Sequence, residues 1–237
     1  MPVTSAVLWT LLPLAAAAVA GVVAAIQRPG ARLTSLLQHL AAGVVFAAAA
    51  VELVPPVLEQ DPGVAVTGFA VGIVVLQGMR WVDRRVHDKQ PRGVVPWGLV
   101  GATGLDFLVD GLVLGAGFAA GGHLGPLLAV AVTLEYLFVG LSLASALGDT
   151  ARALHRVSVP AGLALLTVAG SAVGAVLLAA ASPAVLAGFF AFGAVAFMYL
   201  VTEELLVRAH EQGATTWGSA TFFVGFLAYL VIRELSD

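Results

Sequence analysis

Long apolar segments alternate with short polar connections along the whole chain. Each segment is long enough to cross a bilayer as a single helix, which needs about 20 apolar residues. Glycine and proline mark several connections, as at Pro62, Gly63, Gly121, Gly122 and Pro183. The pattern predicts eight transmembrane helices, near 5–26, 35–58, 64–82, 97–120, 124–147, 158–181, 184–207 and 217–235.

The composition supports an integral membrane protein. Hydrophobic residues make up 60% of the 237 positions and charged residues only 11%, whereas soluble domains carry about 25% charged residues. We therefore expect one all-α transmembrane domain over residues 1–237, with no nucleic-acid partner. The absence of cysteine excludes disulfides, thiolate metal ligands and cysteine nucleophiles. The N-terminus lacks a basic region and a convincing cleavage site, so we interpret it as the first span.

Basic residues are distributed unevenly between the connections. Cytoplasmic connections carry an excess of Lys and Arg, and only Arg233 falls in an even-numbered connection or at the C-terminal end. The odd-numbered connections hold all the others: Arg28, Arg32, Arg80, Arg84, Arg85, Lys89, Arg92, Arg152, Arg156 and Arg208. This bias predicts a multi-pass protein of the cell membrane with both termini on the extracytoplasmic side.

Three acidic residues lie in the middle of apolar segments. Asp106 and Asp110 are one helical turn apart in the fourth segment, and Glu135 lies at similar depth in the fifth. Three charges near the bilayer centre cost roughly 8–10 kcal/mol on insertion scales. The structural alternative is an acidic pair satisfied by hydroxyls or buried water. No basic residue lies in a span centre to balance the three acids, which favours a functional role.

The three carboxylates are expected to converge. The short connection at Gly121 and Gly122 makes the fourth and fifth helices antiparallel neighbours, and the glycines that follow Asp110 allow a close helix crossing. Carboxylate oxygens suit divalent cations. Thr133 is a weak additional ligand at most, since its hydroxyl has the alternative of bonding to its own helix backbone.

Further acids lie toward the ends of two other segments. Glu52 belongs to the outer half of the second segment, and Glu203 and Glu204 to the inner half of the seventh. They are candidates to line an entrance and an exit of a pathway, with only one of the adjacent pair facing it. The alternative is that these acids reach solvent.

The histidines suggest no site. His39, His87, His123, His155 and His210 show no metal-ligand spacing, and we interpret each as a surface residue. The chain also lacks a phosphate-binding glycine loop, a serine nucleophile motif and an HExxH motif. Two segments of the chain share a short sequence similarity, or echo. It links AAAVELVPPVLEQ, which ends the second segment, to YLVTEELLVRAHEQ, which ends the seventh. Such an echo is compatible with two inverted halves.

Two segments carry a family resemblance. HLAAGVVFAAAAVELVPPVLEQ is similar to the second helix of the ZIP (Zrt/Irt-like) metal-ion transporters, which ends in an acidic or histidine residue before a Leu-Pro step. FGAVAFMYLVTEELLVRAHE is similar to their seventh helix, with its paired glutamates. The chain resembles a divergent ZIP member over nearly its whole length. The resemblance implies eight helices in a 3+2+3 inverted-repeat bundle.

The fourth and fifth helices depart from the family motifs. The fourth-helix motif His-Asn-x-Pro-Glu/Asp-Gly aligns with residues 106–111, so aspartate replaces histidine at Asp106 and Phe107 replaces a ligating asparagine. In the fifth helix, residues 135–140, the second acid is Val139, and both motif prolines are absent. The resemblance then implies one metal site, made of Asp106, Asp110 and Glu135. The loss of imidazole favours manganese or ferrous iron over zinc.

The resulting hypothesis is a transporter, not an enzyme, that moves a divalent metal ion toward the cytoplasm by alternating access. No resident cofactor is expected. ZIP members often form dimers, and GFAVG at 68–72 would permit close helix pairing in a homodimer. Three alternatives remain open: a ZIP-fold protein that carries protons or a small cation, an intramembrane aspartyl protease, and a scaffold without transport. The protease is the weakest of these, because it needs aspartates on facing helices.

Overall fold

The computed structural model describes residues 2–26, 30–87, 97–147, 153–211 and 217–236, and this part of the chain is all-helical. Two short π-helical turns, η1 (Ala49–Leu53) and η2 (Val201–Leu205), interrupt longer helices. The α-helices are α1 (Pro2–Trp9), α2 (Leu11–Ile26), α3 (Ala31–Ala48), α4 (Val54–Leu58), α5 (Pro62–His87), α6 (Trp97–Ala120), α7 (Leu124–Ala146), α8 (Ala153–Leu178), α9 (Pro183–Leu200), α10 (Leu206–Glu211) and α11 (Gly218–Glu234).

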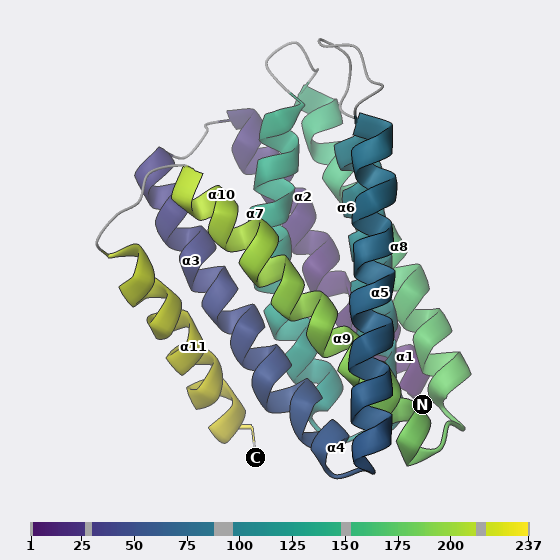
Figure 1. Cartoon of the computed structure of the whole chain (residues 1–237). Helices are drawn as coiled ribbons and strands as arrows, with labels where there is room; N and C mark the ends of the chain where they lie inside the picture. Colours follow the sequence, from purple (N-terminus) through teal and green to yellow (C-terminus); the bar gives the residue numbers. More distant parts are fainter. Residues whose placement is uncertain (1, 27–29, 88–96, 148–152, 212–216, 237) are drawn as a thin grey trace.

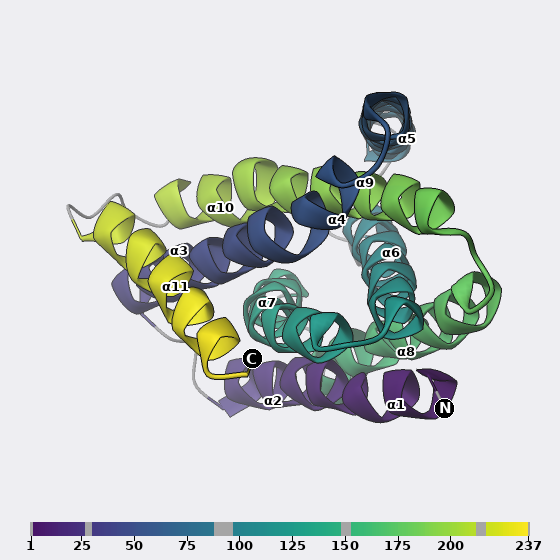
Figure 2. The same cartoon turned by 90° about the horizontal axis from the view of Figure 1, so that it is seen from below.

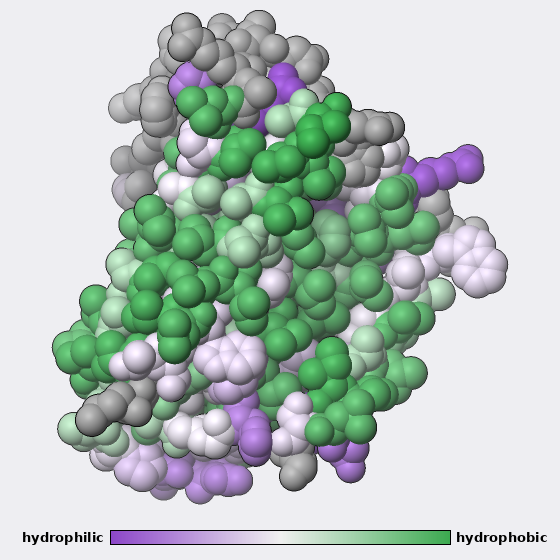
Figure 3. Space-filling view, turned by 180° about the vertical axis from the view of Figure 1, so that it is seen from behind, coloured by the Kyte–Doolittle hydropathy of each residue, from purple (hydrophilic) through white to green (hydrophobic). Residues whose placement is uncertain are grey.

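Each predicted apolar segment coincides with one helix or with consecutive helices. Six of the described helices are long and apolar enough to cross a membrane: Val3–Ile26, Ala31–Leu58, Val100–Ala120, Leu124–Ser145, Leu154–Leu178 and Pro183–Glu211. Hydrophobic residues cover much of the face seen in Figure 3, while hydrophilic residues gather toward its lower edge. Such a surface belongs in lipid, and the chain is a membrane protein.

The helices pack in pairs around α7, which lies inside the bundle when it is viewed along its axis (Figure 2). α6 packs along α8 and α2 along α7, while α3 pairs with α11 and α5 with α9. α5 stands outside α9 at the edge of the bundle. Both termini lie at the same end, the lower one in Figure 1, and α4 also lies there. α10 lies toward the opposite end.

Glycines set the closest helix contacts. A Cβ atom on Gly111 would lie 2.4 Å from the carbonyl oxygen of Thr167, and one on Gly115 would lie 2.4 Å from that of Ser171. α6 and α8 therefore touch backbone to backbone. This confirms the prediction that Asp106 and Asp110 sit at a tight helix crossing. Gly121 and Gly122 have positive φ angles of 83° and 66° and form the turn between α6 and α7, which makes these helices antiparallel neighbours.

The glycines of GFAVG are used within the chain. A Cβ atom on Gly68 would lie 2.6 Å from Cβ of Ala191 and 2.8 Å from the carbonyl oxygen of Gly188, both on α9. Gly72 faces Val195 of the same helix. These two glycines therefore serve a contact between α5 and α9 within the chain, and the homodimer stays a prediction.

The two π-helical turns fall on the segments that echo each other in sequence. η1 has the sequence AAVEL and contains Glu52, and η2 has the sequence VTEEL and contains Glu203 and Glu204. A π-helical turn inserts an extra residue into an α-helix and is frequent at functional sites. The same irregularity therefore occurs at the same place in the two echoing segments.

Candidate functional site

The three acids predicted from the sequence meet inside the bundle. Asp106 and Asp110 project from one face of α6, and Glu135 projects from α7. One carboxylate oxygen from each residue lies within 4.8 Å of the other two. Asp110 and Glu135 are buried, and Asp106 is partly exposed. We refer to these three residues as the acidic triad.

No ion pair of the acidic triad is found in the part of the chain that the structure describes. The ion pairs there involve Glu204 and Glu52, and neither carboxyl oxygen of Glu135 has a hydrogen-bond partner. Two unit charges within 4.8 Å of each other repel by about 3.5 kcal/mol at an effective dielectric constant of ~20. The ionised cluster therefore needs a cation, or protons, to be stable in the protein interior.

Tyr136 holds Asp110 in place, a role that was not predicted from the sequence. The Tyr136 hydroxyl donates a hydrogen bond to Oδ2 of Asp110 at 3.2 Å and also pairs with the hydroxyl of Thr167 on α8. All three side chains are buried. The network connects the triad to the α6–α8 contact and fixes the direction of one carboxylate.

Phe107 and Val139 fill the space beside the triad. The ring of Phe107 stacks on that of Tyr136, with centroids 3.7 Å apart and an interplanar angle of 14°. Both Phe107 and Val139 are buried. An aromatic stack and an aliphatic side chain therefore occupy this space, and neither offers a ligand atom to a cation.

Thr133 is not a ligand in this conformation. Its hydroxyl donates to the carbonyl oxygen of Ala129 in its own helix at 2.6 Å. This is the alternative that the sequence left open for this residue.

Access to the triad differs between its two sides. Toward the C-terminal end of α6, Val113 and Leu114 are fully buried, as is Leu53 of η1, and Gly193 on α9 packs against both Val113 and Leu53. Asp106, on the opposite side, is partly exposed. Apolar side chains therefore close the side that faces the chain termini, and the other side is the more open.

Glu204 lies on the more open side. It interacts electrostatically with all three acids of the triad, and it forms an ion pair with Arg208 of the next turn, at 3.1 Å. Glu203 is exposed. Of the two adjacent glutamates, Glu204 is thus the one near the triad, since adjacent residues on a helix point in different directions.

Glu52 does not reach solvent. Its side chain is largely buried, and Oε1 lies 3.0 Å from Nε of Arg233 on α11. The sequence alternative of a solvated acid at a helix end is therefore wrong for this residue. The cause is tertiary, because α11 packs along α3 and carries Arg233 to the same end of the bundle.

The interpretation of His39 as a surface residue is also wrong. Its side chain is only 3% exposed, and its ring lies edge-on to that of His210, with centroids 5.1 Å apart. Nδ1 of His39 and Nδ1 of His210 each hydrogen-bond a backbone carbonyl one turn earlier. His123, His155 and His210 are exposed, as expected. The side chain of His87 and the basic residues Arg28, Lys89, Arg92 and Arg152 lie outside the described residues.

Replacing Tyr136 by phenylalanine is expected to weaken Mn²⁺ binding by roughly tenfold while the fold is retained. The variant loses the hydrogen bonds to Asp110 and Thr167, each worth about 1–2 kcal/mol, but keeps the stack on Phe107. Titration of the purified protein with Mn²⁺ measures the change. The matched control is Thr133→Val on the same helix, which removes a hydroxyl bonded only to backbone. Equal affinities for Tyr136→Phe and Thr133→Val would contradict a positioning role.

Two comparisons with known proteins find nothing similar to this chain, so the function of the site is inferred from its geometry. A scan against known protein families finds no match for this chain. A search of curated proteins finds no significantly similar relative. The convergence of three carboxylates from two neighbouring helices is thus the strongest indication of function.

Proposed function

We propose that this protein is a ZIP-like transporter that moves a divalent metal ion across the membrane toward the cytoplasm. The observation that carries the proposal is the acidic triad, in which three carboxylates meet inside an apolar helical bundle and form no ion pair within the described residues. Ionisable residues inside membrane spans are costly and usually mark ion pathways. Oxygen-only ligands suit Mn²⁺ or Fe²⁺ better than a softer ion.

The packing of the helices supports a ZIP-like arrangement of eight spans. α2, α3 and α5 would form one half and α8, α9 and α11 the other, with α6 and α7 between them. In such an arrangement α2 corresponds to α8, α3 to α9, α5 to α11 and α6 to α7. The contacts fit this correspondence, because α2 packs on α7 as α8 packs on α6, and α5 packs on α9 as α11 packs on α3. The π-helical turns η1 and η2 also occupy corresponding positions. Inverted halves around a site at mid-depth are a common transporter plan.

The two sides of the triad fit an inward-facing state. With both termini outside, the closed side next to Val113 and Leu53 faces outward, and the partly exposed Asp106 faces the cytoplasm. A metal ion held by the triad would pass Glu204 on its way in. Opening the outer side requires the apolar contact of Leu53, Val113 and Gly193 to separate, which is the step that alternating access demands.

Metal uptake into proteoliposomes tests the proposal. We expect saturable Mn²⁺ or Fe²⁺ uptake by the wild-type protein, and its loss, by at least tenfold, in the Asp106→Asn/Asp110→Asn double variant. The amides keep the shape of the side chains but cannot balance a divalent charge. Glu59→Gln, at an exposed position on the loop after α4, is the control. Uptake that survives unchanged in the double variant would exclude the triad as the transport site.

One specific observation favours proton transfer as the second candidate. The hydroxyls of Tyr136 and Thr167 form a hydrogen-bonded chain that ends on Asp110, and such chains can pass protons. If the protein transfers protons, a pH gradient across the proteoliposome membrane should dissipate, and the protein should show no saturable binding of Mn²⁺, Fe²⁺, Zn²⁺ or Cd²⁺. A protease remains disfavoured, because Asp106 and Asp110 both project from α6.

A further inference from the structure

Glu52 and Arg233 form an ion pair at the end of the bundle that holds both chain termini. Oε1 of Glu52 lies 3.0 Å from Nε of Arg233, and the glutamate side chain is 9% exposed against 38% for the arginine. The acid is thus held inside the bundle, while the guanidinium lies at its rim. Arg233 was also the one basic residue that the charge pattern left on this side of the membrane.

The partners of this pair come from two helices that are fixed against each other. A Cβ atom on Gly43 of α3 would lie 1.9 Å from the carbonyl oxygen of Phe222, and one on Gly225 of α11 would lie 2.1 Å from that of Leu40. The two backbones are therefore in direct contact. The guanidinium reaches Glu52 because this contact sets the position of α11, so Arg233 can leave Glu52 by a side-chain movement alone.

Tyr229 provides a spare hydrogen-bond donor at the same place. It lies one turn before Arg233 on α11, it is fully buried, and its hydroxyl has no hydrogen-bond partner among the residues that the structure describes. It interacts electrostatically with both Glu52 and Arg233. A buried hydroxyl without a partner is costly, and this one is close to the carboxylate that Arg233 neutralises.

We propose that Arg233 is a tethered counter-ion that occupies Glu52, so that Glu52 becomes a ligand for a divalent cation only when the guanidinium moves away. The inference rests on the proposed cation transport, and it adds a second, normally masked cation site at the outer end. An arginine carries one charge and a divalent ion carries two, so an arriving ion can displace the arginine. Until then the bound guanidinium lowers the affinity of the outer entrance.

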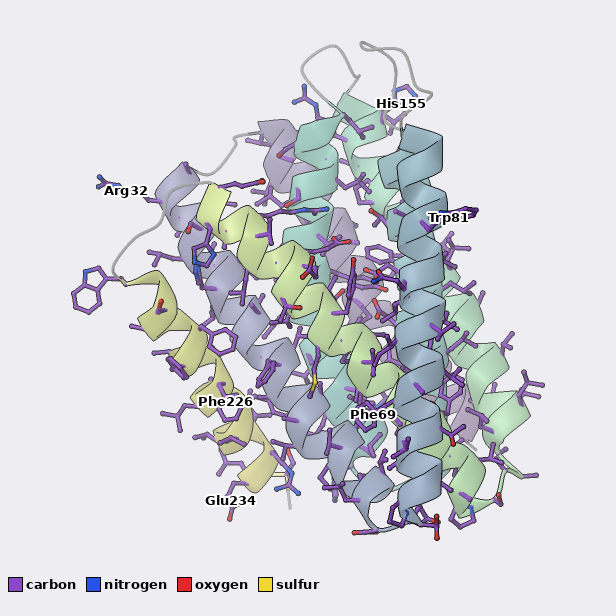
Figure 4. The ribbon with its side chains drawn as sticks, viewed as in Figure 1. Arg32, Phe69, Trp81, His155, Phe226 and Glu234 are labelled. Carbon is purple, nitrogen blue, oxygen red and sulfur yellow. The ribbon has the colours of Figure 1, made fainter. Side chains whose placement is uncertain are left out.

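Stoichiometric titration of the full-length protein in nanodiscs with Mn²⁺ tests the inference. We expect the wild-type protein to bind one equivalent, at the triad, and Arg233→Gln to bind two. The added equivalent should disappear in Glu52→Gln/Arg233→Gln. Glu234→Gln is the matched control, since Glu234 is the next residue on α11 and is exposed, at the lower end of the bundle in Figure 4. This variant should titrate as the wild type does.

A charge-rescue experiment separates loss of the arginine from damage to the fold. The chain has no cysteine, so Arg233→Cys introduces the only thiol. Modification of this thiol with a quaternary-ammonium thiosulfonate restores a positive charge, whereas a methylating thiosulfonate leaves the position neutral. The neutral adduct should bind the additional Mn²⁺ and the cationic adduct should not, although both derive from one folded preparation.

The outcomes distinguish this inference from the proposed function. Wild-type stoichiometry in both Arg233→Gln and the neutral Arg233→Cys adduct would overturn the role of Arg233 and leave the triad untouched. If the wild-type protein bound no Mn²⁺, transport of this ion through the triad would fail. Even in that case, the masked site would be supported if Arg233→Gln bound one equivalent of Mn²⁺ and Glu52→Gln/Arg233→Gln bound none.

Discussion

The Glu135→Gln variant is expected to be more heat-stable than the wild-type protein without metal, and to lose the stabilisation that metal confers. Glu135 is fully buried, and its oxygens have no hydrogen-bond donor within the described part of the chain. A neutral amide of the same shape removes the cost of burying a charge and can donate to Asp110, so we expect a gain of about 1–3 kcal/mol. The wild-type protein should instead gain about 2.7 kcal/mol at a Mn²⁺ concentration 100 times Kd.

Thermal unfolding of the purified protein with and without Mn²⁺ measures both effects. Glu211→Gln, which changes an exposed acid on α10, controls for the change in net charge. A structural carboxylate would behave in the opposite way: its replacement would lower the melting temperature, and metal would stabilise wild type and variant equally. That pair of results would remove Glu135 from the cation site.

The helices and the triad could be predicted because their signals are local. Apolar segments of bilayer length define the helices without any tertiary information, and the turn at Gly121 and Gly122 brings the fourth and fifth of them together. Asp106 and Asp110 share a face through helical periodicity alone. Glu135 joins them because it is at the same depth on the next helix, so sequence distance from the turn is sufficient to align the three.

The remaining features depend on contacts between distant parts of the chain. Nothing near Glu52 in the sequence indicates Arg233, which is brought to it by the glycine contacts of α3 and α11. His39 is buried because Gly218, on α11, leaves room for its ring. Tyr136 next to Glu135 was a visible signal, since a hydroxyl in an apolar helix needs a partner, but its partner Thr167 could not be chosen from the sequence.

The acidic triad is held in place by contacts between neighbouring helices. Asp110 is held by Tyr136 and by the backbone contact of Gly111 with Thr167, and neither requires a bent helix. The aromatic stack of Phe107 on Tyr136 fills the space beside the acids. The site is therefore supported by the packing of α6 against α7 and α8.

Gly111→Ala is expected to lower the stability of the protein by about 3 kcal/mol and to weaken Mn²⁺ binding together with it. The added Cβ would lie 2.4 Å from the carbonyl oxygen and 2.8 Å from Cα of Thr167. Backbone atoms cannot rotate away, so α6 and α8 must separate, and overpacking of this kind typically costs 1–3 kcal/mol or more. The separation also moves Asp110 and breaks the pairing of Tyr136 with Thr167.

Gly101→Ala is the matched control, because it makes the same change on the same helix at a position where a Cβ atom meets nothing within 4 Å. Its stability should be unchanged or higher by up to about 1 kcal/mol, since alanine favours the helix over glycine. Unfolding midpoints and Mn²⁺ titrations of both variants give the comparison. If Gly111→Ala matched Gly101→Ala in both measurements, the backbone contact between α6 and α8 would not be what holds the carboxylates together, and the geometry of the triad would need another cause.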